Sequence, residues 1–286
     1  MDSSNPKPKL IKHGRLRRGI YLLPSLFTVG TLVCGYFAIL STLKGTQMLA
    51  AGLTATLSLV AFDNAAKAIG WAVLFDGLDG RIARMTNSSS DFGREFDSLA
   101  DVVAFGIAPA FLAYAWGVRS VEELYGTQLV QYFRQIGWIV TFTFVICGAA
   151  RLARFNIDST KGTQDRRFFI GLPIPAAAGV VAAIVHWTKT PVDEWVHGVI
   201  GLCVMAILAF LMVSRVRYYS FKGVNLRQRR PYVAIIVLGL IVWLIAAYSE
   251  PVLLTLALTY LLSGPLGRIV SRWRSQPPTP KEVHAA

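Results

Sequence analysis

Six acidic residues gather in the stretch DGLDGRIARMTNSSSDFGREFDSLAD, which runs from residue 76 to residue 101 between strongly apolar segments. In a helix that turns 100° per residue, Asp76 and Asp79 lie about 60° apart on one face. After the polar turn MTNSSSDF, Asp97 and Asp101 are four residues apart, and they therefore share a face of a second helix. Two antiparallel helices joined by this turn would direct all four carboxylates toward one point.

Four carboxylates at one point in an apolar environment require neutralising cations, because like charges repel strongly at low dielectric constant. Oxygen ligands suit hard divalent ions such as Mg²⁺, Mn²⁺ or Ca²⁺. A pair of ions bridged by carboxylates suits phosphoryl chemistry. The small residues Gly80, Ala83 and Gly93 beside the carboxylates would let a bulky ligand approach the backbone.

Two other interpretations of the stretch are open. Charges on the solvated ends of two helices would explain Asp91, Arg94 and Glu95, but not Asp76 and Asp97, which have apolar neighbours. A proton or ion transporter would also place carboxylates within the membrane. The polar turn and the small residues favour an enzyme that binds a nucleotide, because transport has no evident use for them.

Composition and hydropathy indicate the elements that position these residues. The chain is 54% hydrophobic and only 16% charged, and its mean hydropathy is +0.49. Soluble domains average about 45–50% apolar and about 25% charged residues. Apolar segments long enough for membrane helices predict an all-α integral membrane protein with about eight transmembrane helices. The segments lie near residues 20–43, 64–86, 95–118, 135–155, 171–187, 196–214, 232–249 and 251–269.

The net charge of +13 is explained by membrane topology and requires no nucleic acid. With the N-terminus in the cytoplasm, 24 of the 29 lysines and arginines fall in segments on the inner side. This asymmetry follows the positive-inside rule. It predicts a protein of the cytoplasmic membrane with both termini and the carboxylates on the cytoplasmic side. The inner segments are 1–19, 81–94, 151–170, 215–231 and 268–286.

The spans divide the chain into five predicted regions. They are a basic cytoplasmic segment with an interfacial helix (1–19), a catalytic transmembrane core (20–214), a basic loop (215–231), two additional transmembrane helices (232–269) and a disordered tail (270–286). The apolar segment 47–62 is short, and counting it as a further span would invert every later loop. We therefore expect an interfacial or re-entrant segment there.

The carboxylates and their neighbours form the pattern Asp76-x2-Asp79-Gly80-x2-Ala83-Arg84-x8-Gly93-x3-Asp97-x3-Asp101, which resembles the signature of the CDP-alcohol phosphatidyltransferase family. The resemblance implies a six-helix core with two added C-terminal helices, makes 44–63 an insertion, and suggests a homodimer. It implies two Mg²⁺ or Mn²⁺ ions held by Asp76, Asp79, Asp97 and Asp101. Asp101 would also be the general base. The implied CDP-binding residues are Gly80, Ala83, Arg84, Gly93 and, in the first span, Thr28.

The first span is similar to the start of the family's core, where Pro24, Thr28 and Gly35 match. Ser25 and Thr31 stand at positions where asparagine is usual. Three further stretches resemble the branch of the family that uses L-serine as acceptor. They are ARLARFN (150–156), GLPIPAAAG (171–179) and VSRVRYYSFKG (213–223).

The implied reaction transfers the phosphatidyl group of CDP-diacylglycerol to L-serine and releases CMP, with the lipid bilayer as the surroundings. Another acceptor, such as glycerol 3-phosphate or inositol phosphate, would use the same residues. Basic residues in the three stretches are candidates for binding the acceptor or a phosphate, because guanidinium groups bind both carboxylates and phosphates. They could equally be ordinary positive-inside anchors. These candidates are Arg151, Arg154, Arg215 and Lys222.

Overall fold

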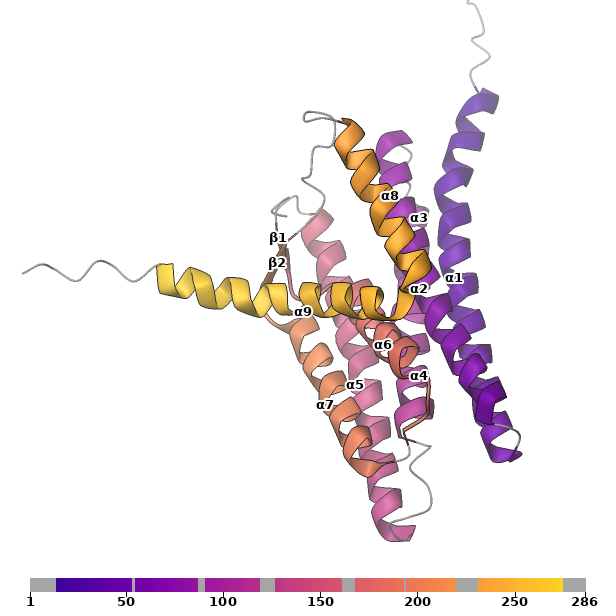
Figure 1. The fold of residues 1–286 in the computed structure, drawn as a ribbon. Coiled ribbons are helices and arrows are strands. Elements are labelled where there is room, and N and C mark those ends of the chain that lie inside the picture. The colour runs from indigo at the N-terminus through magenta and orange to yellow at the C-terminus, as the bar shows by residue number, and fades with distance from the viewer. Residues whose placement is uncertain are drawn as a thin grey trace, which may run out of the picture.

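The computed structural model describes residues 14–52, 55–86, 91–118, 127–160, 168–192, 194–219 and 231–274. This part of the chain is almost entirely helical (Figure 1). Its helices are α1 (Gly14–Ala50), α2 (Ala55–Thr86), α3 (Asp91–Asp101), the π-helix η1 (Val102–Ile107), α4 (Ala108–Gly117), α5 (Thr127–Thr160), α6 (Ile174–Thr188), α7 (Trp195–Val213), α8 (Pro231–Ala247) and α9 (Ser249–Arg274).

Each of the eight predicted spans corresponds to a helix, with α3, η1 and α4 together making the third. Within the described residues, six helical segments are long and apolar enough to cross a membrane, and the protein is therefore a multi-pass membrane protein. The helices α6, with 15 residues, and α8, with 17, are shorter than the roughly 20 residues of an average span. The six segments are Leu26–Ala50, Thr56–Ile82, Asp91–Gly117, Gln128–Asp158, Trp195–Val213 and Ser249–Arg268.

The prediction of a separate interfacial or re-entrant segment at 47–62 is wrong. Residues 47–50 complete α1, and residues 55–62 begin α2. The helix α1 ends at a turn in which Gly52 has φ +62°, a conformation that glycine adopts without strain. The hydropathy of the sequence located the portions of α1 and α2 that face lipid. It did not locate the ends of these helices, because each helix continues beyond its lipid-facing portion. That 44–63 is an insertion stays a prediction.

The third span is one continuous rod that changes its helical pitch directly after Asp101. Residues 102–107 form η1, in which the N–H of Ala108 donates to the carbonyl of Val103, five residues earlier. Pro109 follows at the start of α4 and lacks a backbone N–H. Short π-helical segments within α-helices are rare and occur frequently at functional sites.

The interior between the helices consists mainly of small residues, which allow close helix packing in membranes. Gly35 of α1 faces η1 so closely that an added Cβ would lie 2.6 Å from the Cα of Ala104. Large apolar side chains such as Phe37, Trp138 and Phe210 are exposed on the outside. This arrangement fits lipid as the surrounding medium. Buried alanines include Ala38, Ala65, Ala66, Ala72, Ala104, Ala108, Ala177 and Ala178.

A small antiparallel sheet, which the all-helical prediction did not include, joins two connecting segments. Strand β1 (Phe168–Ile170) pairs with β2 (Arg217–Tyr219), with Phe169 opposite Tyr218. Three residues per strand are too few to show the alternation that identifies strands in a sequence. The sheet places the buried side chain of Tyr218 against α9.

The last helix, α9, runs across the other helices in Figure 1 and packs against α6 and β2. It continues to Arg274, beyond the predicted helix end at residue 269. The rest of the predicted tail lies outside the described residues, as do residues 1–13 of the predicted N-terminal segment. Residues 14–19 of that segment begin α1 without a break.

Candidate active site

Three of the four predicted carboxylates meet between α2 and α3. One ligand oxygen from each of Asp76, Asp97 and Asp101 lies within 4.8 Å of the others. Asp76 comes from α2, while Asp97 and Asp101 are one turn apart on α3. The facing arrangement that the helical spacing predicts is therefore present.

The fourth carboxylate, that of Asp79, is buried next to this trio and has a different partner. It accepts a hydrogen bond from the hydroxyl of Thr28 on α1. Both side chains are almost inaccessible, at 6% exposure for Asp79 and 3% for Thr28. The negative charge of Asp79 also repels the negative charges of Asp97 and Asp101. Thr28 thus orients a carboxylate at the edge of the cluster.

The cluster suits a divalent cation on two grounds. Its donors are all carboxylate oxygens, which is the ligand set of hard cations. In addition, Oδ1 of Asp101 is buried and has no hydrogen-bond partner among the described residues. A buried carboxylate oxygen without a donor costs free energy unless a cation compensates it. The trio of Asp76, Asp97 and Asp101 could therefore bind a metal ion.

The acidic stretch contains two populations of charged residues, as the sequence analysis predicts. Asp91 and Arg94 form an ion pair of 2.5 Å at the start of α3, where the side chain of Asp91 is 94% exposed. Glu95 is exposed as well. These residues stabilise a solvated helix end and do not face the cluster.

Arg151 of α5 is the basic residue associated with the cluster. Its guanidinium interacts electrostatically with Asp101 and Asp76, and it lies 5.5 Å from the ring centre of Phe155. Five residues later, the side-chain amide of Asn156 donates to the hydroxyl of Ser98 over 2.8 Å. This bond ties α5 to α3 beside Asp97, so the helix that carries Arg151 is fixed relative to the carboxylates.

For the other three basic candidates, no association with the carboxylates is observed among the described residues. Arg154 and Arg215 are exposed, and Lys222 lies outside the described residues. Of the acceptor or phosphate candidates, the structure associates Arg151 alone with the carboxylates within the described part of the chain.

Four of the candidate CDP-binding residues lie on the two helices of the cluster, and the fifth, Thr28, lies on α1. Gly80, Ala83 and Arg84 belong to α2, and Gly93 belongs to α3. A Cβ added to Gly80 would meet no atom of the described residues within 4 Å. The packing of the protein therefore does not explain this glycine, whereas a ligand that approaches the backbone would. The side chains of Ala83 and Arg84 lie outside the described residues.

Two features of the site were not predicted from the sequence. One is η1. The residues that could have indicated it in the sequence are Gly106 and Pro109, shortly after Asp101. The other is Tyr260 of α9, which interacts electrostatically with Arg151. No motif surrounds Tyr260, and a tyrosine in an apolar helix is ordinarily read as an interfacial residue.

Known proteins resemble this chain over most of its length. It is 38% identical over 229 residues to the CDP-diacylglycerol–serine O-phosphatidyltransferase of Helicobacter pylori (strain ATCC 700392 / 26695), covering 78% of this chain and 82% of the relative. The protein of the same name from Bacillus subtilis (strain 168) is 34% identical over 200 residues, covering 70% and 91%. That from Mycobacterium leprae (strain TN) is 30% identical over 272 residues, covering 92% and 81%.

The sequence model described as CDP-alcohol phosphatidyltransferase matches residues 21–216, which include α2, α3, η1 and all four clustered carboxylates. The match ends before β2, α8 and α9. On this match and on these relatives, the chain belongs to the CDP-alcohol phosphatidyltransferase family.

Proposed function

We propose that this protein transfers the phosphatidyl group of CDP-diacylglycerol to the hydroxyl of L-serine, giving phosphatidylserine and CMP. The observation that carries the proposal is the convergence of Asp76, Asp97 and Asp101 next to Arg151 in a membrane-embedded member of this family. The relatives that bear the serine transferase name support L-serine as the acceptor.

Asp76, Asp79, Asp97 and Asp101 would hold two divalent ions, Mg²⁺ or Mn²⁺. When bound, such ions neutralise the carboxylates and the diphosphate of the substrate and stabilise the charge that develops on the leaving CMP. The hydrogen bond from Thr28 supports this assignment, because it favours the ionised form of Asp79 and fixes the direction of its carboxylate.

Asp101 is the proposed general base. The Asp101 carboxylate joins the cluster and has two oxygens, so that one could contact a metal ion while the other takes a proton. The serine hydroxyl would give its proton to Asp101 as its oxygen attacks the lipid-linked phosphorus in line. The new phosphorus–oxygen bond forms as the bond to CMP breaks, and no covalent intermediate with the enzyme is needed.

Substrate contacts are proposed on both sides of the carboxylates. Gly80, Ala83, Gly93 and Thr28 would line the CDP site, with Arg84 on the diphosphate. The open space at Gly80 supports this placement.

On the acceptor side, Arg151 would bind the serine carboxylate with its guanidinium. Arg154, Arg215 and Lys222 remain candidates for phosphate contacts at the mouth of the site.

We propose the cytoplasmic membrane as the location, with both termini and the active site on the cytoplasmic side. The excess of lysine and arginine in the inner segments supports this orientation. Serine and CMP would use the basic cytoplasmic mouth, while the lipid chains would enter sideways between helices. A homodimer is proposed from the family resemblance.

An assay with purified protein, Mn²⁺ or Mg²⁺, CDP-diacylglycerol and labelled serine tests the function. We expect serine-dependent release of CMP and a labelled lipid. Reaction with glycerol 3-phosphate or inositol phosphate, but not with serine, would show that the acceptor is wrong. Ion flux in liposomes without CMP release would indicate a transporter, which the family match does not favour.

The variant Asp101→Asn tests the assignment of the base. It should remain folded in detergent but lose about 10²–10⁴-fold or more in turnover, the range expected for removing a general base. Full activity of this variant would refute the role of Asp101.

A further inference from the structure

The direction in which α3 turns its carboxylates does not follow from the packing of α4. The π-helix η1 separates the two helices, and its wider turns break the regular advance of 100° per residue. The carboxylates of the cluster also repel each other when no ion is bound. This repulsion favours a rotation of α3 that would move Asp97 and Asp101 away from Asp76. A contact that resists this rotation would therefore contribute directly to the site.

One face of α5 runs along the third span from η1 to α3. At η1, the side chain of Val145 lies beside Gly106, where an added Cβ would be 3.8 Å from Cγ1 of Val145. Asn156 follows Val145 by eleven residues, which places it within about 20° on the same face of the helix. The side-chain amide of Asn156 donates to the hydroxyl of Ser98 on α3 over 2.8 Å. This face of α5 thus contacts η1 and also the helix that precedes it.

The same face of α5 is anchored in the interior of the protein. Leu152, one turn before Asn156, is 6% exposed and belongs to the hydrophobic core. One turn earlier, Gly148 lets α5 approach α6 closely, because an added Cβ would lie 2.5 Å from Cδ1 of Ile174. The helix also packs against α4 and α7. Asn156 therefore extends from a helix that is held at several places, and it offers α3 a fixed point of attachment.

Ser98 uses its hydroxyl twice, which gives the contact with Asn156 a defined direction. The hydroxyl donates to the carbonyl of Arg94 in its own helix over 2.9 Å, and it accepts from the amide of Asn156. Ser98 lies on the flank of the carboxylate face, about 100° from Asp97 and about 60° from Asp101 around the helix. An attachment at this flank resists rotation of both carboxylates about the axis of α3.

We infer that Asn156 is a positioning residue of the metal site, which holds α3 through Ser98. The rotation of α3 that it preserves directs the carboxylates of Asp97 and Asp101 toward Asp76. The inference rests on the proposed function, because that function assigns divalent ions to these carboxylates. With α3 held in this rotation before an ion arrives, binding requires less rearrangement of the helix and is therefore tighter. Asn156 acts through Ser98, without binding the ions itself.

The test uses Asn156→Leu, which nearly keeps the shape of the side chain but removes its amide, and Ser98→Ala, which removes the acceptor. We expect each variant to weaken the binding of Mn²⁺ about 2- to 12-fold, the range that corresponds to one hydrogen bond between neutral groups. Binding is measured without substrate, from the electron paramagnetic resonance signal of free Mn²⁺. Turnover at saturating Mn²⁺ should stay close to that of the wild type. The matched control is Thr143→Val, which should keep the wild-type affinity, because Thr143 is exposed on α5 and donates to the carbonyl of Ile139 in its own helix.

The double variant shows whether Asn156 acts through Ser98. If it does, the double variant should lose no more Mn²⁺ affinity than the more affected single variant, whereas two losses that add would overturn the inference. Wild-type Mn²⁺ affinity in both single variants would also overturn it, even with a lowered melting temperature, because the bond would then serve stability alone. If the wild-type protein bound no Mn²⁺, the inference and the metal assignment would both be wrong. If the variants behaved as expected but the wild type released no CMP with serine, the proposed function alone would fail.

Discussion

Replacing Thr28 with valine tests what the hydrogen bond from Thr28 contributes to the carboxylate of Asp79. Valine has nearly the shape of threonine, so the change removes one hydroxyl from a position that is 3% exposed. The hydroxyl donates to Asp79, which is itself 6% exposed. The variant therefore leaves a buried carboxylate without this donor, while the packing of α1 on α2 is retained.

The size of the effect follows from the charge on the acceptor. A hydrogen bond to an ionised group contributes about 1.5–3 kcal/mol. Since about 1.4 kcal/mol corresponds to a factor of ten in an equilibrium constant, the apparent affinity for the activating metal should fall roughly 10- to 150-fold. Maximal turnover at saturating metal should change much less, because the carboxylates themselves are retained.

The measurement is CMP release as a function of Mn²⁺ concentration, together with the rise in melting temperature that Mn²⁺ produces without substrate. The control is Thr31→Val, because Thr31 is also buried in α1 but donates to the carbonyl of Phe27 in its own helix. The reasoning is refuted if Thr28→Val keeps the wild-type metal dependence, or if both variants weaken it equally. A rise only in the KM for CDP-diacylglycerol would show that Thr28 contacts the nucleotide.

Three further predictions concern the framework and the metal. Gly35→Val should lower thermal stability by about 1–3 kcal/mol through overpacking, because its Cβ would lie 2.6 Å from Ala104; Gly70→Ala, whose Cβ would meet no atom within 4 Å in the described part of the chain, should not. Chelation with EDTA should abolish CMP release, and Mn²⁺ or Mg²⁺ should restore it; activity that survives thorough chelation would exclude a metal-dependent site. Deleting Val103 should convert η1 to α-helix while α3 and α4 keep nearly their present relative orientation, because the wider turns of η1 accommodate one extra residue; circular dichroism should stay helical and turnover should persist, and a variant that loses both would contradict this interpretation of η1.

The carboxylate cluster could be predicted from the sequence because it depends on local geometry. The spacing of Asp97 and Asp101 fixes their common face on α3, and that face lies toward Asp76 of α2. Helix existence was equally accessible, since lipid imposes long apolar segments. The ends of α1 and α2 near Gly52 could not be predicted, because hydropathy reports contact with lipid and not the length of a helix.

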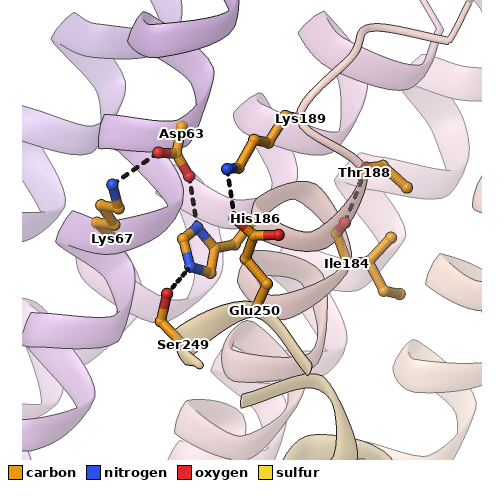
Figure 2. A network of polar contacts seen from close by, with 8 residues as sticks. All are labelled: Asp63, Lys67, Ile184, His186, Thr188, Lys189, Ser249 and Glu250. Atoms are coloured by element: carbon orange, nitrogen blue, oxygen red, sulfur yellow. Dashed lines mark hydrogen bonds and ion pairs between the residues drawn. The ribbon is translucent and has the colours of Figure 1, made fainter. Parts of the chain in front are cut away.

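Contacts between distant segments were beyond sequence reasoning. Tyr260 follows Tyr218 by about forty residues, and the packing of the two rings depends on the path of α9 across the core. That path depends in turn on the contact between Ser249 and His186 (Figure 2) and on the close packing of Gly264 against the ring of Tyr218. A single sequence contains no periodicity or spacing that would pair these positions.

The π-helical turn after Asp101 has a consequence for how this enzyme can change over evolutionary time. In an uninterrupted α-helix, the direction of the carboxylate face of α3 would fix the direction of the packing face of α4, because every residue turns the helix by the same angle. The wider turns of η1 (Val102–Ile107) accommodate one extra residue, so the direction of the α3 face no longer fixes the direction of the α4 face. The half of the rod in α4 can thus adapt to its neighbours and to the thickness of the bilayer, while the aspartates upstream keep the one register that their chemistry permits.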